Sequence, residues 1–215
     1  MSTRRRAVAC WPSLVVALLL LLGTGCTSPS RVRLAGKEDV AGFVAGTALP
    51  QPYLMPDQVL TDTWGHDYNL ATSPSKPVTL LFFGYTHCRS VCVAVLSDVA
   101  LTLQRMDAAH RDQVQVVFVT TDPARDTGPK IRAYLDRFDP GFVGLTGDLV
   151  TIKRVAARVG VDIEGTAARA GGGYDVGHSA HVVGFERGHG VVLWAPGTPV
   201  RDLRHDVETL VDRAS

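Results

Sequence analysis

Two cysteines, Cys88 and Cys92, are the residues whose type and spacing most directly indicate chemistry. Residues four positions apart lie on the same face of a helix, with their Cβ atoms about 5–6 Å apart. A disulfide needs Cβ atoms nearer about 3.8 Å, so this pair can close only if Cys88 lies in a loop or in a first helical turn. The dipole and free N–H groups of a helix start also lower the pKa of a thiol placed there. The pair is therefore suited to redox chemistry or to holding one soft metal ion.

Two thiolates leave a metal ion under-coordinated, and a neutral histidine is the natural third donor. His178 is the best placed, because it follows a glycine-rich segment and directly precedes a predicted strand. We expect that segment to let His178 swing over the end of the sheet. Two sulfurs and one imidazole suit copper, with zinc as a competitor. The alternatives are a redox-active disulfide and a merely structural cysteine pair. The remaining histidines are His66, His87, His110, His181, His189 and His205.

Hydrophobic runs and turn signals indicate the elements that must position these residues. Residues 78–83 and 114–120 are apolar runs typical of strands covered on both faces. Residues 88–106 keep apolar side chains at helical spacing, which places Cys88 at the helix start. Further predicted elements are hairpins of 59–62 with 68–70 and of 182–186 with 191–194, a short strand at 142–145, and helices at 127–138, 148–159 and 200–213.

This order of elements predicts an α/β fold with a mixed central sheet flanked by helices and with an N-terminal β-hairpin. Asp148 is a candidate N-cap for the helix that follows it. Residues 160–180, which include three consecutive glycines, are expected to form a flexible loop.

The first 25 residues predict a secretory signal peptide of the lipoprotein type. Three arginines at 4–6 precede an apolar run at 14–22, and small residues lead to Cys26. The run is short for a membrane-spanning helix, which needs about 20 residues. The segment resembles the bacterial lipobox, in which Cys26 would be lipidated and become the mature N-terminus. An uncleaved N-terminal anchor is the alternative.

This assignment predicts three parts: the signal at 1–25, a lipidated N-terminus and flexible tether at 26–48, and a folded domain at 49–215. The domain would lie at the cell membrane, lipid-anchored and facing the extracytoplasmic side. Of the four cysteines, only Cys88 and Cys92 would remain as thiols, in a compartment that tends to oxidise them.

The composition is that of a folded protein with no nucleic-acid-binding character. The 215 residues are 46% hydrophobic and 20% charged, with a formal net charge of +1. Because the charge is nearly balanced and no basic run lies in the body of the chain, a nucleic-acid partner is excluded. The chain also has no phosphate-binding loop motif, which argues against a nucleotide enzyme of that class.

Residues 83–92, FGYTHCRSVC, resemble the F-x-Y-T-x-C-x-x-x-C-P signature of the Sco (SenC-type) family. Together the matches run over about residues 48–213. Two positions depart from the pattern: Val93 stands where the family usually has proline, and Gly177 replaces a frequent aspartate before the histidine. Collinear matches follow at 60–65 (LTD with a glycine), 121–127 (TDPARDT), 144–147 (GLTG) and 174–179 (YDVGHS).

Sco proteins are thioredoxin-fold copper proteins that help to assemble the binuclear copper centre of cytochrome c oxidase. The resemblance implies a thioredoxin-like fold, copper ions (Cu(I)/Cu(II)) held by Cys88, Cys92 and His178, and the copper-site subunit of the oxidase as partner. It implies a membrane-tethered copper metallochaperone. The alternative is a thiol–disulfide oxidoreductase that reduces the copper-site cysteines of the oxidase and uses Cys88 and Cys92 as a redox-active disulfide. A peroxidase is a third hypothesis.

Several neighbours are candidates for supporting the site. Asp122, Arg125 and Asp126 would orient it through a salt bridge, and Tyr85 would either wall it or pack in the core. The alternative for this segment is a turn and cap, with Asp126 or Thr127 starting the next helix.

Other side chains near the motifs have weaker claims. His87 is a minor candidate ligand beside Cys88, and His181 is expected to point away from the face of His178. Tyr174 would either wall the site or pack in the core. Trp64 and Trp194 are expected to be core or hairpin-packing residues.

Overall fold

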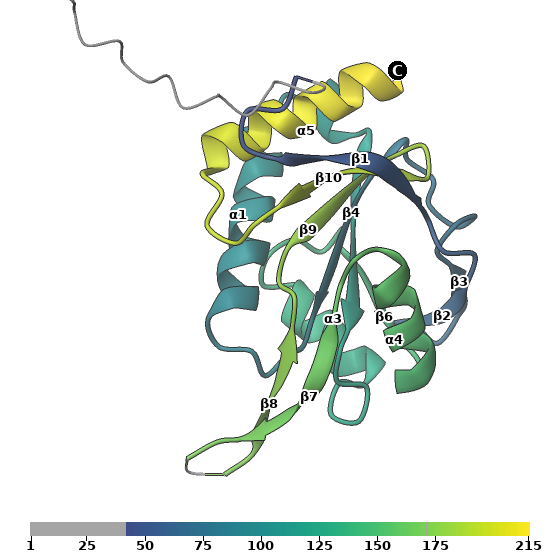
Figure 1. Cartoon of the computed structure of the whole chain (residues 1–215), viewed down its shortest axis with the longest axis vertical. Helices are drawn as coiled ribbons and strands as arrows, with labels where there is room; N and C mark the ends of the chain where they lie inside the picture. Colours follow the sequence, from purple (N-terminus) through teal and green to yellow (C-terminus); the bar gives the residue numbers. More distant parts are fainter. Residues whose placement is uncertain (1–41, 171) are drawn as a thin grey trace, which may run out of the picture. The chain divides into compact units, whose positions relative to one another are not determined.

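The computed structural model describes residues 42–170 and 172–215, and its centre is an eight-stranded mixed sheet (Figure 1). The predicted mixed sheet flanked by helices is confirmed. In order across the sheet, the strands are β1 (Thr47–Leu54), β10 (His189–Trp194), β9 (Val182–Glu186), β4 (Val78–Gly84), β5 (Val114–Thr120), β6 (Val143–Thr146), β2 (Val59–Asp62) and β3 (Asp67–Asn69).

The centre of the sheet is parallel and its edges are antiparallel. β5 lies parallel to both β4 and β6, with Phe82 opposite Phe118 and Val119 opposite Leu145. β9 runs antiparallel to β4, and the predicted hairpin of β2 with β3 adds the other edge. The carboxyl ends of β4, β5 and β6 therefore meet at one end of the sheet, where the loop with the cysteines begins.

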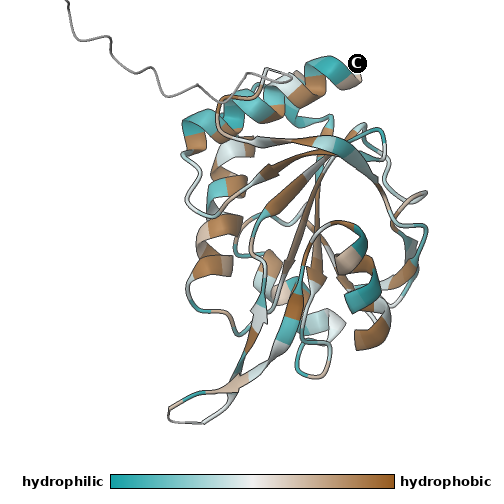
Figure 2. Cartoon of the chain, in the orientation of Figure 1, coloured by the Kyte–Doolittle hydropathy of each residue, from teal (hydrophilic) through white to brown (hydrophobic). Residues whose placement is uncertain are grey.

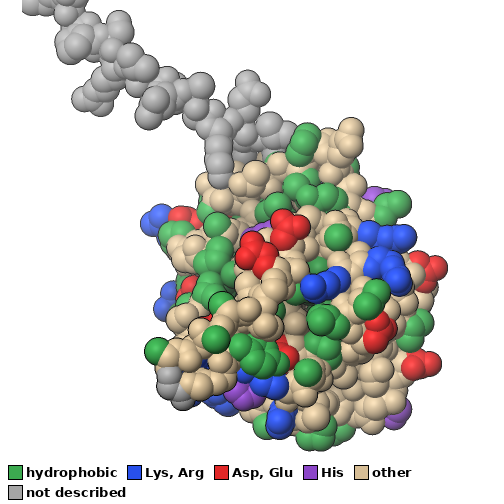
Figure 3. Space-filling model, turned by 60° about the horizontal axis from the view of Figure 1, so that its bottom comes forward, with side chains coloured by type: hydrophobic (Ala, Val, Ile, Leu, Met, Phe, Trp, Pro, Cys, Tyr) green, Lys and Arg blue, Asp and Glu red, His purple; other side chains and the backbone are tan. Residues whose placement is uncertain are grey.

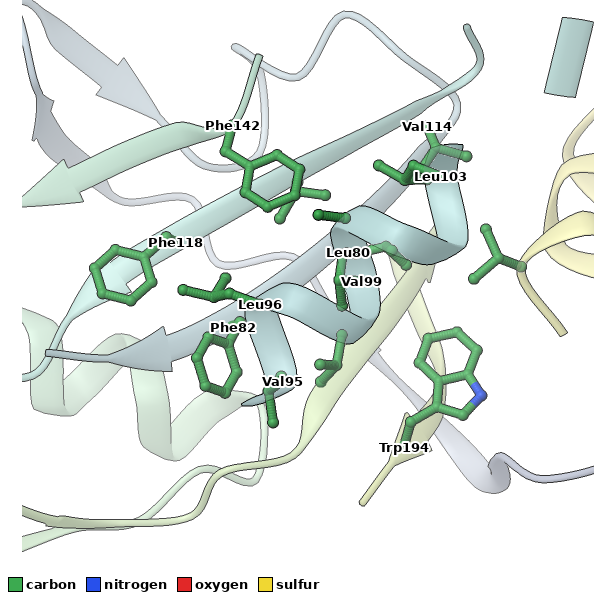
Figure 4. Packing of buried hydrophobic residues seen from close by; sticks show 14 of the residues in the cluster. Leu80, Phe82, Val95, Leu96, Val99, Leu103, Val114, Phe118, Phe142 and Trp194 are labelled. Carbon is green, nitrogen blue, oxygen red and sulfur yellow. The ribbon is translucent and has the colours of Figure 1, made fainter. Parts of the chain in front are cut away.

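Side chains of the central strands alternate between two hydrophobic cores, which is why β4 and β5 read as continuous apolar runs (Figure 2). Leu80 and Phe82 lie in the core shared with α1, α3 and α5, part of which Figure 4 shows. Leu81 and Phe83 face the second core, which α4 covers. The Trp194 residue is 1% exposed and lies in the core, as expected.

The helices begin and end close to the predicted positions, with one difference that matters for the site. α1 begins at Val91 rather than Cys88, so Cys88 lies in the preceding loop. Asp148 caps α4 as predicted, accepting the Thr151 N–H at 2.8 Å. A one-turn helix, α2, was not predicted. The helices are α1 (Val91–Arg105), α2 (Ala108–Arg111), α3 (Gly128–Leu135), α4 (Leu149–Arg158) and α5 (Val200–Ala214).

The expected flexible loop at 160–180 is instead a hairpin of two strands, β7 (Ile163–Ala168) and β8 (Tyr174–His178), so that prediction was wrong. The glycines serve its turn, where Gly172 and Gly173 both have positive φ. β7 and β8 form their own two-stranded sheet, and Figure 1 shows it reaching past the end of the main sheet. His178 is the last residue of β8 rather than part of a swinging loop.

A buried carboxylate on α5 fixes the start of the described chain. Asp206 is fully buried and accepts hydrogen bonds from the backbone N–H groups of Val44 (2.7 Å), Ala45 (3.2 Å) and Gly46 (2.7 Å). The Trp194 Nε1–H donates to the same carboxylate at 2.9 Å. A charged acceptor with four donors offsets the cost of its burial. This contact leads directly into β1, an edge strand that the sequence analysis did not predict.

The predicted signal peptide, Cys26 and most of the predicted tether lie outside the described residues. Within residues 42–170 and 172–215, none of the helices has the length and apolar character needed to cross a membrane.

Candidate metal centre

Cys88 lies just before α1 and partly caps it. Ser90 is the N-cap residue, but its side chain makes no capping hydrogen bond. Instead, the Cys92 N–H donates to the Cys88 sulfur at 3.3 Å. One of the free N–H groups at the helix start is thereby satisfied by sulfur. The loop position is the one that the i, i+4 spacing requires for two cysteines to approach each other.

The two thiols are unequal, although both are buried and free. A hydrogen bond from the Cys92 side chain lowers the pKa of Cys88 to about 6, against the desolvation that burial imposes, and backbone N–H groups at the helix start add to this. The same hydrogen bond, together with burial, raises the pKa of Cys92. At neutral pH the Cys88 sulfur is therefore the thiolate, and Cys92 is the protonated partner that stabilises it.

His178 comes to the cysteines from β8. Its Nε2 lies 3.8 Å from the Cys92 sulfur, while its Nδ1 lies 3.2 Å from the Val176 carbonyl oxygen. An Nδ1–H donated to that carbonyl leaves the Nε2 lone pair directed at sulfur, the tautomer that a metal ligand needs. The Tyr85 ring packs edge-on against the imidazole, with centroids 5.8 Å apart. The structure thus brings all three predicted ligand residues together.

The donor set fits a soft metal ion, and one pair of donors already has the right separation. Metal bonds of about 2.3 Å to sulfur and about 2.0 Å to imidazole place two tetrahedral donors about 3.5 Å apart. The 3.8 Å between Cys92 and His178 is close to this value. In the part of the chain that the structure describes, no three His, Cys, Asp or Glu side chains already surround a single metal position. Binding of one ion by all three residues therefore requires some movement of their side chains.

Access to this site is through an open pocket of about 280 Å³ between the cysteine loop and β8. Cys88 and His178 line it, whereas Cys92 is fully buried behind them. Figure 3 shows that acidic, basic and hydrophobic side chains are interspersed on the face that it draws. The pocket itself is lined by charges of both signs, Arg89, Arg169 and Asp175.

Asp126 holds the cysteine loop rather than capping a helix. It is fully buried, and it accepts hydrogen bonds from the Thr86 N–H (2.9 Å), the Thr86 hydroxyl (2.6 Å) and the Thr120 hydroxyl (2.7 Å). Thr127 is the N-cap position of α3 and makes no side-chain capping bond there. Thr127, and not Asp126, therefore starts α3, so the prediction that Asp126 caps this helix is wrong. The buried carboxylate ties the loop before Cys88 to the end of β5.

Asp122 and Arg125 form the expected salt bridge. Both residues also make hydrogen bonds to Tyr174 in β8. The Tyr174 hydroxyl donates to Asp122 at 2.9 Å, and Arg125 donates to the Tyr174 carbonyl at 3.1 Å. The guanidinium also lies 3.5 Å from the centroid of the Tyr174 ring, a cation–π distance. Tyr174 thus links β8 to the Asp122–Arg125 pair, and its ring also packs against the core shared with α1, α3 and α5.

Two residues that the sequence analysis did not assign, Arg169 and Asp175, form an ion pair at the rim of the pocket. Asp175 also accepts the Tyr85 hydroxyl at 2.7 Å, and Arg169 donates to the His87 carbonyl at 3.3 Å. The signal that could have found them is the glycine triplet. If it is treated as a hairpin turn, it places residues 169 and 175 near each other across two strands.

The weaker candidates have other contacts or other places in the fold. The His87 side chain is 46% exposed, with Nδ1 3.2 Å from the Thr86 hydroxyl and 3.8 Å from Asp126. His181 lies in the connection between β8 and β9, where burial lowers its pKa. Trp64 is 71% exposed at the turn between β2 and β3, so its expected packing role was wrong.

Steric crowding explains why glycine stands at position 177 in this chain. A Cβ atom added there would lie 2.8 Å from Glu164 Oε2 and 3.0 Å from Glu164 Cβ on the neighbouring strand. A side chain next to His178 therefore does not fit unless Glu164 moves. The carboxylate found near the site is Asp175, two residues earlier in β8.

The fold and the site together define a thioredoxin-like protein that carries two thiols and one imidazole at the end of its sheet. Residues 48–212 match the model of the SCO1/SenC family. The chain belongs to this family, which confirms the resemblance found in its motifs.

Relatives and solved structures agree with this assignment. A protein from Stutzerimonas stutzeri that carries the provisional name copper-binding protein is 32% identical over 180 residues, which are 80% of this chain and 84% of that protein. The solution structure of apo Sco1 from Thermus thermophilus has a TM-score of 0.69 at 30% identity, covering 77% of this chain and 95% of its own. The copper-bound structure of ScoI from Bradyrhizobium japonicum has a TM-score of 0.61 at 28% identity, covering 80% and 100% respectively.

Proposed function

We propose that this protein is a membrane-tethered, extracytoplasmic metallochaperone that binds copper and delivers it to the binuclear copper site of cytochrome c oxidase. The observation that carries the proposal is the 3.8 Å approach of His178 Nε2 to the Cys92 sulfur, with Cys88 hydrogen-bonded to the same cysteine. Two soft sulfurs and one imidazole favour copper over harder cations.

The family supports both the metal and the acceptor. The Bradyrhizobium japonicum relative was solved with copper bound. The Sco family is described as a family of cytochrome c oxidase assembly proteins. By this proposal copper is a cargo, held by Cys88, Cys92 and His178 and passed on by ligand exchange to the thiolates of the acceptor.

The state of the cysteines would gate that exchange. Copper ligation needs thiolates, and a Cys88–Cys92 disulfide has none to offer. The low pKa of Cys88 supplies one thiolate at neutral pH, and the metal would displace the proton that Cys92 retains. Copper binding would therefore release a proton and require a reduced pair.

The membrane attachment in this proposal rests on the N-terminal sequence. The basic stretch, the apolar run and Cys26 have the pattern of a lipoprotein signal. Metabolic labelling with a fatty acid tests this part separately, because Cys26→Ser should abolish incorporation of the label while leaving copper binding unchanged.

Copper titration tests the binding function. The reduced full-length chain in detergent is titrated with Cu(I) and with Cu(II), alongside Cys88→Ala, Cys92→Ala and His178→Ala. We expect one copper per chain, with a sulfur-to-copper absorption band for Cu(II) that either cysteine variant loses. His181→Ala is the matched control, because it removes a neighbouring imidazole and should bind like wild type. Unchanged affinity in His178→Ala would rule out the third ligand.

A thiol–disulfide oxidoreductase is a second candidate, favoured by the unequal pKa values of the two thiols. The Cys88 thiolate would attack a target disulfide and expel one target thiolate, which leaves a mixed disulfide. Cys92 would then lose its proton and attack Cys88, releasing the reduced target and leaving the Cys88–Cys92 disulfide. If the wild-type chain binds no copper but reduces an oxidised two-cysteine peptide stoichiometrically, this function replaces the metallochaperone.

A further inference from the structure

The hairpin that carries His178 is not part of the main sheet, so something else must hold it beside the cysteines. β7 and β8 pair only with each other among the described strands. At the base of the hairpin, the Ser179 N–H donates to the Asp162 carbonyl at 2.9 Å. That bond joins the two ends of the hairpin to each other. It does not fix the distance from His178 to the cysteine loop.

Side chains of the hairpin make the connection to the cysteine loop. Both oxygens of the Asp175 carboxylate are used: one accepts the Tyr85 hydroxyl at 2.7 Å, and the other accepts Arg169 Nε at 2.7 Å. The Arg169 guanidinium also donates to the carbonyl of His87, the residue before Cys88. This cluster, Tyr85–Arg169–Asp175, therefore joins β7 and β8 to the loop of the first cysteine.

Tyr85 is the residue through which this cluster touches the site. Its ring packs edge-on against the His178 imidazole, and its carbonyl accepts the Cys88 N–H at 3.1 Å. Its hydroxyl donates to Asp175 at 2.7 Å, and burial together with that hydrogen bond raises the pKa of Tyr85 to about 12. One residue thus contacts both the imidazole, through its ring, and Cys88, through its backbone carbonyl, and Asp175 accepts its hydroxyl.

We propose that Asp175, held by Arg169 and bonded to the Tyr85 hydroxyl, is the positioning residue that sets the place of the His178 imidazole opposite Cys92. This inference rests on the proposed copper-binding function. In this chain a carboxylate at the position next to the histidine would crowd Glu164, which lies against Gly177. The carboxylate at Asp175 supports the histidine through the tyrosine ring.

The test is a double-mutant cycle on the full-length chain with Asp175→Ala, Tyr85→Phe and the double variant. Tyr85→Phe keeps the ring and removes only the hydroxyl. Each single variant should weaken copper binding by about 10–100-fold while keeping one copper per chain. The double variant should be no weaker than the weaker single variant, because both changes break the same bond. Tyr174→Phe is the matched control: it removes the other tyrosine hydroxyl bond that holds the hairpin, from Tyr174 in β8 to Asp122, and it should leave affinity within a few-fold of wild type.

Two further readouts separate positioning from general loss of structure. Nitrogen hyperfine coupling in the Cu(II) electron paramagnetic resonance spectrum should weaken in both single variants. In the metal-free protein, the nuclear Overhauser contact between the Tyr85 and His178 rings should also weaken, while circular dichroism stays that of wild type.

The contact between the Tyr85 and His178 rings in the metal-free protein separates the test of the positioning role from the test of copper binding. If wild-type protein binds no copper, the proposed function fails, yet the ring contact still reports on positioning. If the contact, the affinity and the hyperfine coupling all match wild type in Asp175→Ala, the positioning role is overturned. Additive losses in the double variant would equally overturn it, since they would show that the two residues act separately.

Discussion

Replacing Asp126 by alanine should destabilise the domain more than any surface carboxylate change, because this buried side chain holds three donors. The variant leaves the Thr86 N–H, the Thr86 hydroxyl and the Thr120 hydroxyl without their acceptor. A buried polar group left unpaired costs about 1–3 kcal/mol. The hydroxyls can rotate toward other acceptors, whereas the N–H cannot.

Counting the N–H group fully and the hydroxyls in part gives a loss of about 3 kcal/mol in the free energy of unfolding. For a domain of this size, that corresponds to a fall in Tm of about 6–12 °C. The measurement is urea and thermal unfolding of the reduced, metal-free chain followed by circular dichroism.

Asp136→Ala is the matched control for this prediction. Asp136 is half exposed and pairs with Arg132 one helical turn away, so its loss should cost at most about 0.5 kcal/mol. If the free energies of unfolding of Asp126→Ala and of this control differ by less than about 1 kcal/mol, the buried carboxylate does not hold the cysteine loop as described.

Three further outcomes are expected. In the reduced, metal-free chain, the rate of Cys88 alkylation by iodoacetamide should be half-maximal near pH 6 and fall below that pH. Cys92→Ala should move this midpoint to higher pH, because the hydrogen bond from Cys92 is the main cause of the low pKa of Cys88. An unmoved midpoint would contradict that cause. Gly177→Ala should lower the free energy of unfolding by about 1–3 kcal/mol in a denaturant titration, and Glu164→Ala should recover part of the loss by opening the crowded contact. Asp206→Ala should speed amide hydrogen exchange at residues 44–46 at least about tenfold relative to wild type, and protection that persists would show that other contacts hold this segment.

The parts of the fold that the sequence predicts well are those in which burial alone determines the pattern. β4 and β5 are covered on both faces, so their apolar runs predict them directly. β1 was missed because Pro50 and Pro52 interrupt its pattern, and an edge strand can accept them where a central one cannot.

β7 and β8 escaped prediction because β7 has almost no buried face and β8 is a short strand in which only Val176 is buried. The five residues of β7 after Ile163 are exposed, and the hairpin is held by polar side chains that come from distant parts of the chain. The spacing of Cys88 and Cys92 and the context of His178 were enough to identify the three residues that meet at the site. The ion pair of Arg169 with Asp175 was not visible, because it depends on the turn that brings the two strands together.

The hydrogen bonds of Asp206 also have a mechanical consequence. They fix residues 44–46 to α5, next to the strand at one edge of the sheet, while β8, which carries His178, lies at the other end of the domain (Figure 1). Tension on the chain ahead of Val44 would therefore be borne by α5 and not by the loop of Cys88. A pull along the N-terminal segment would thus load the hydrogen bonds of Asp206 before it reached the thiols and the imidazole.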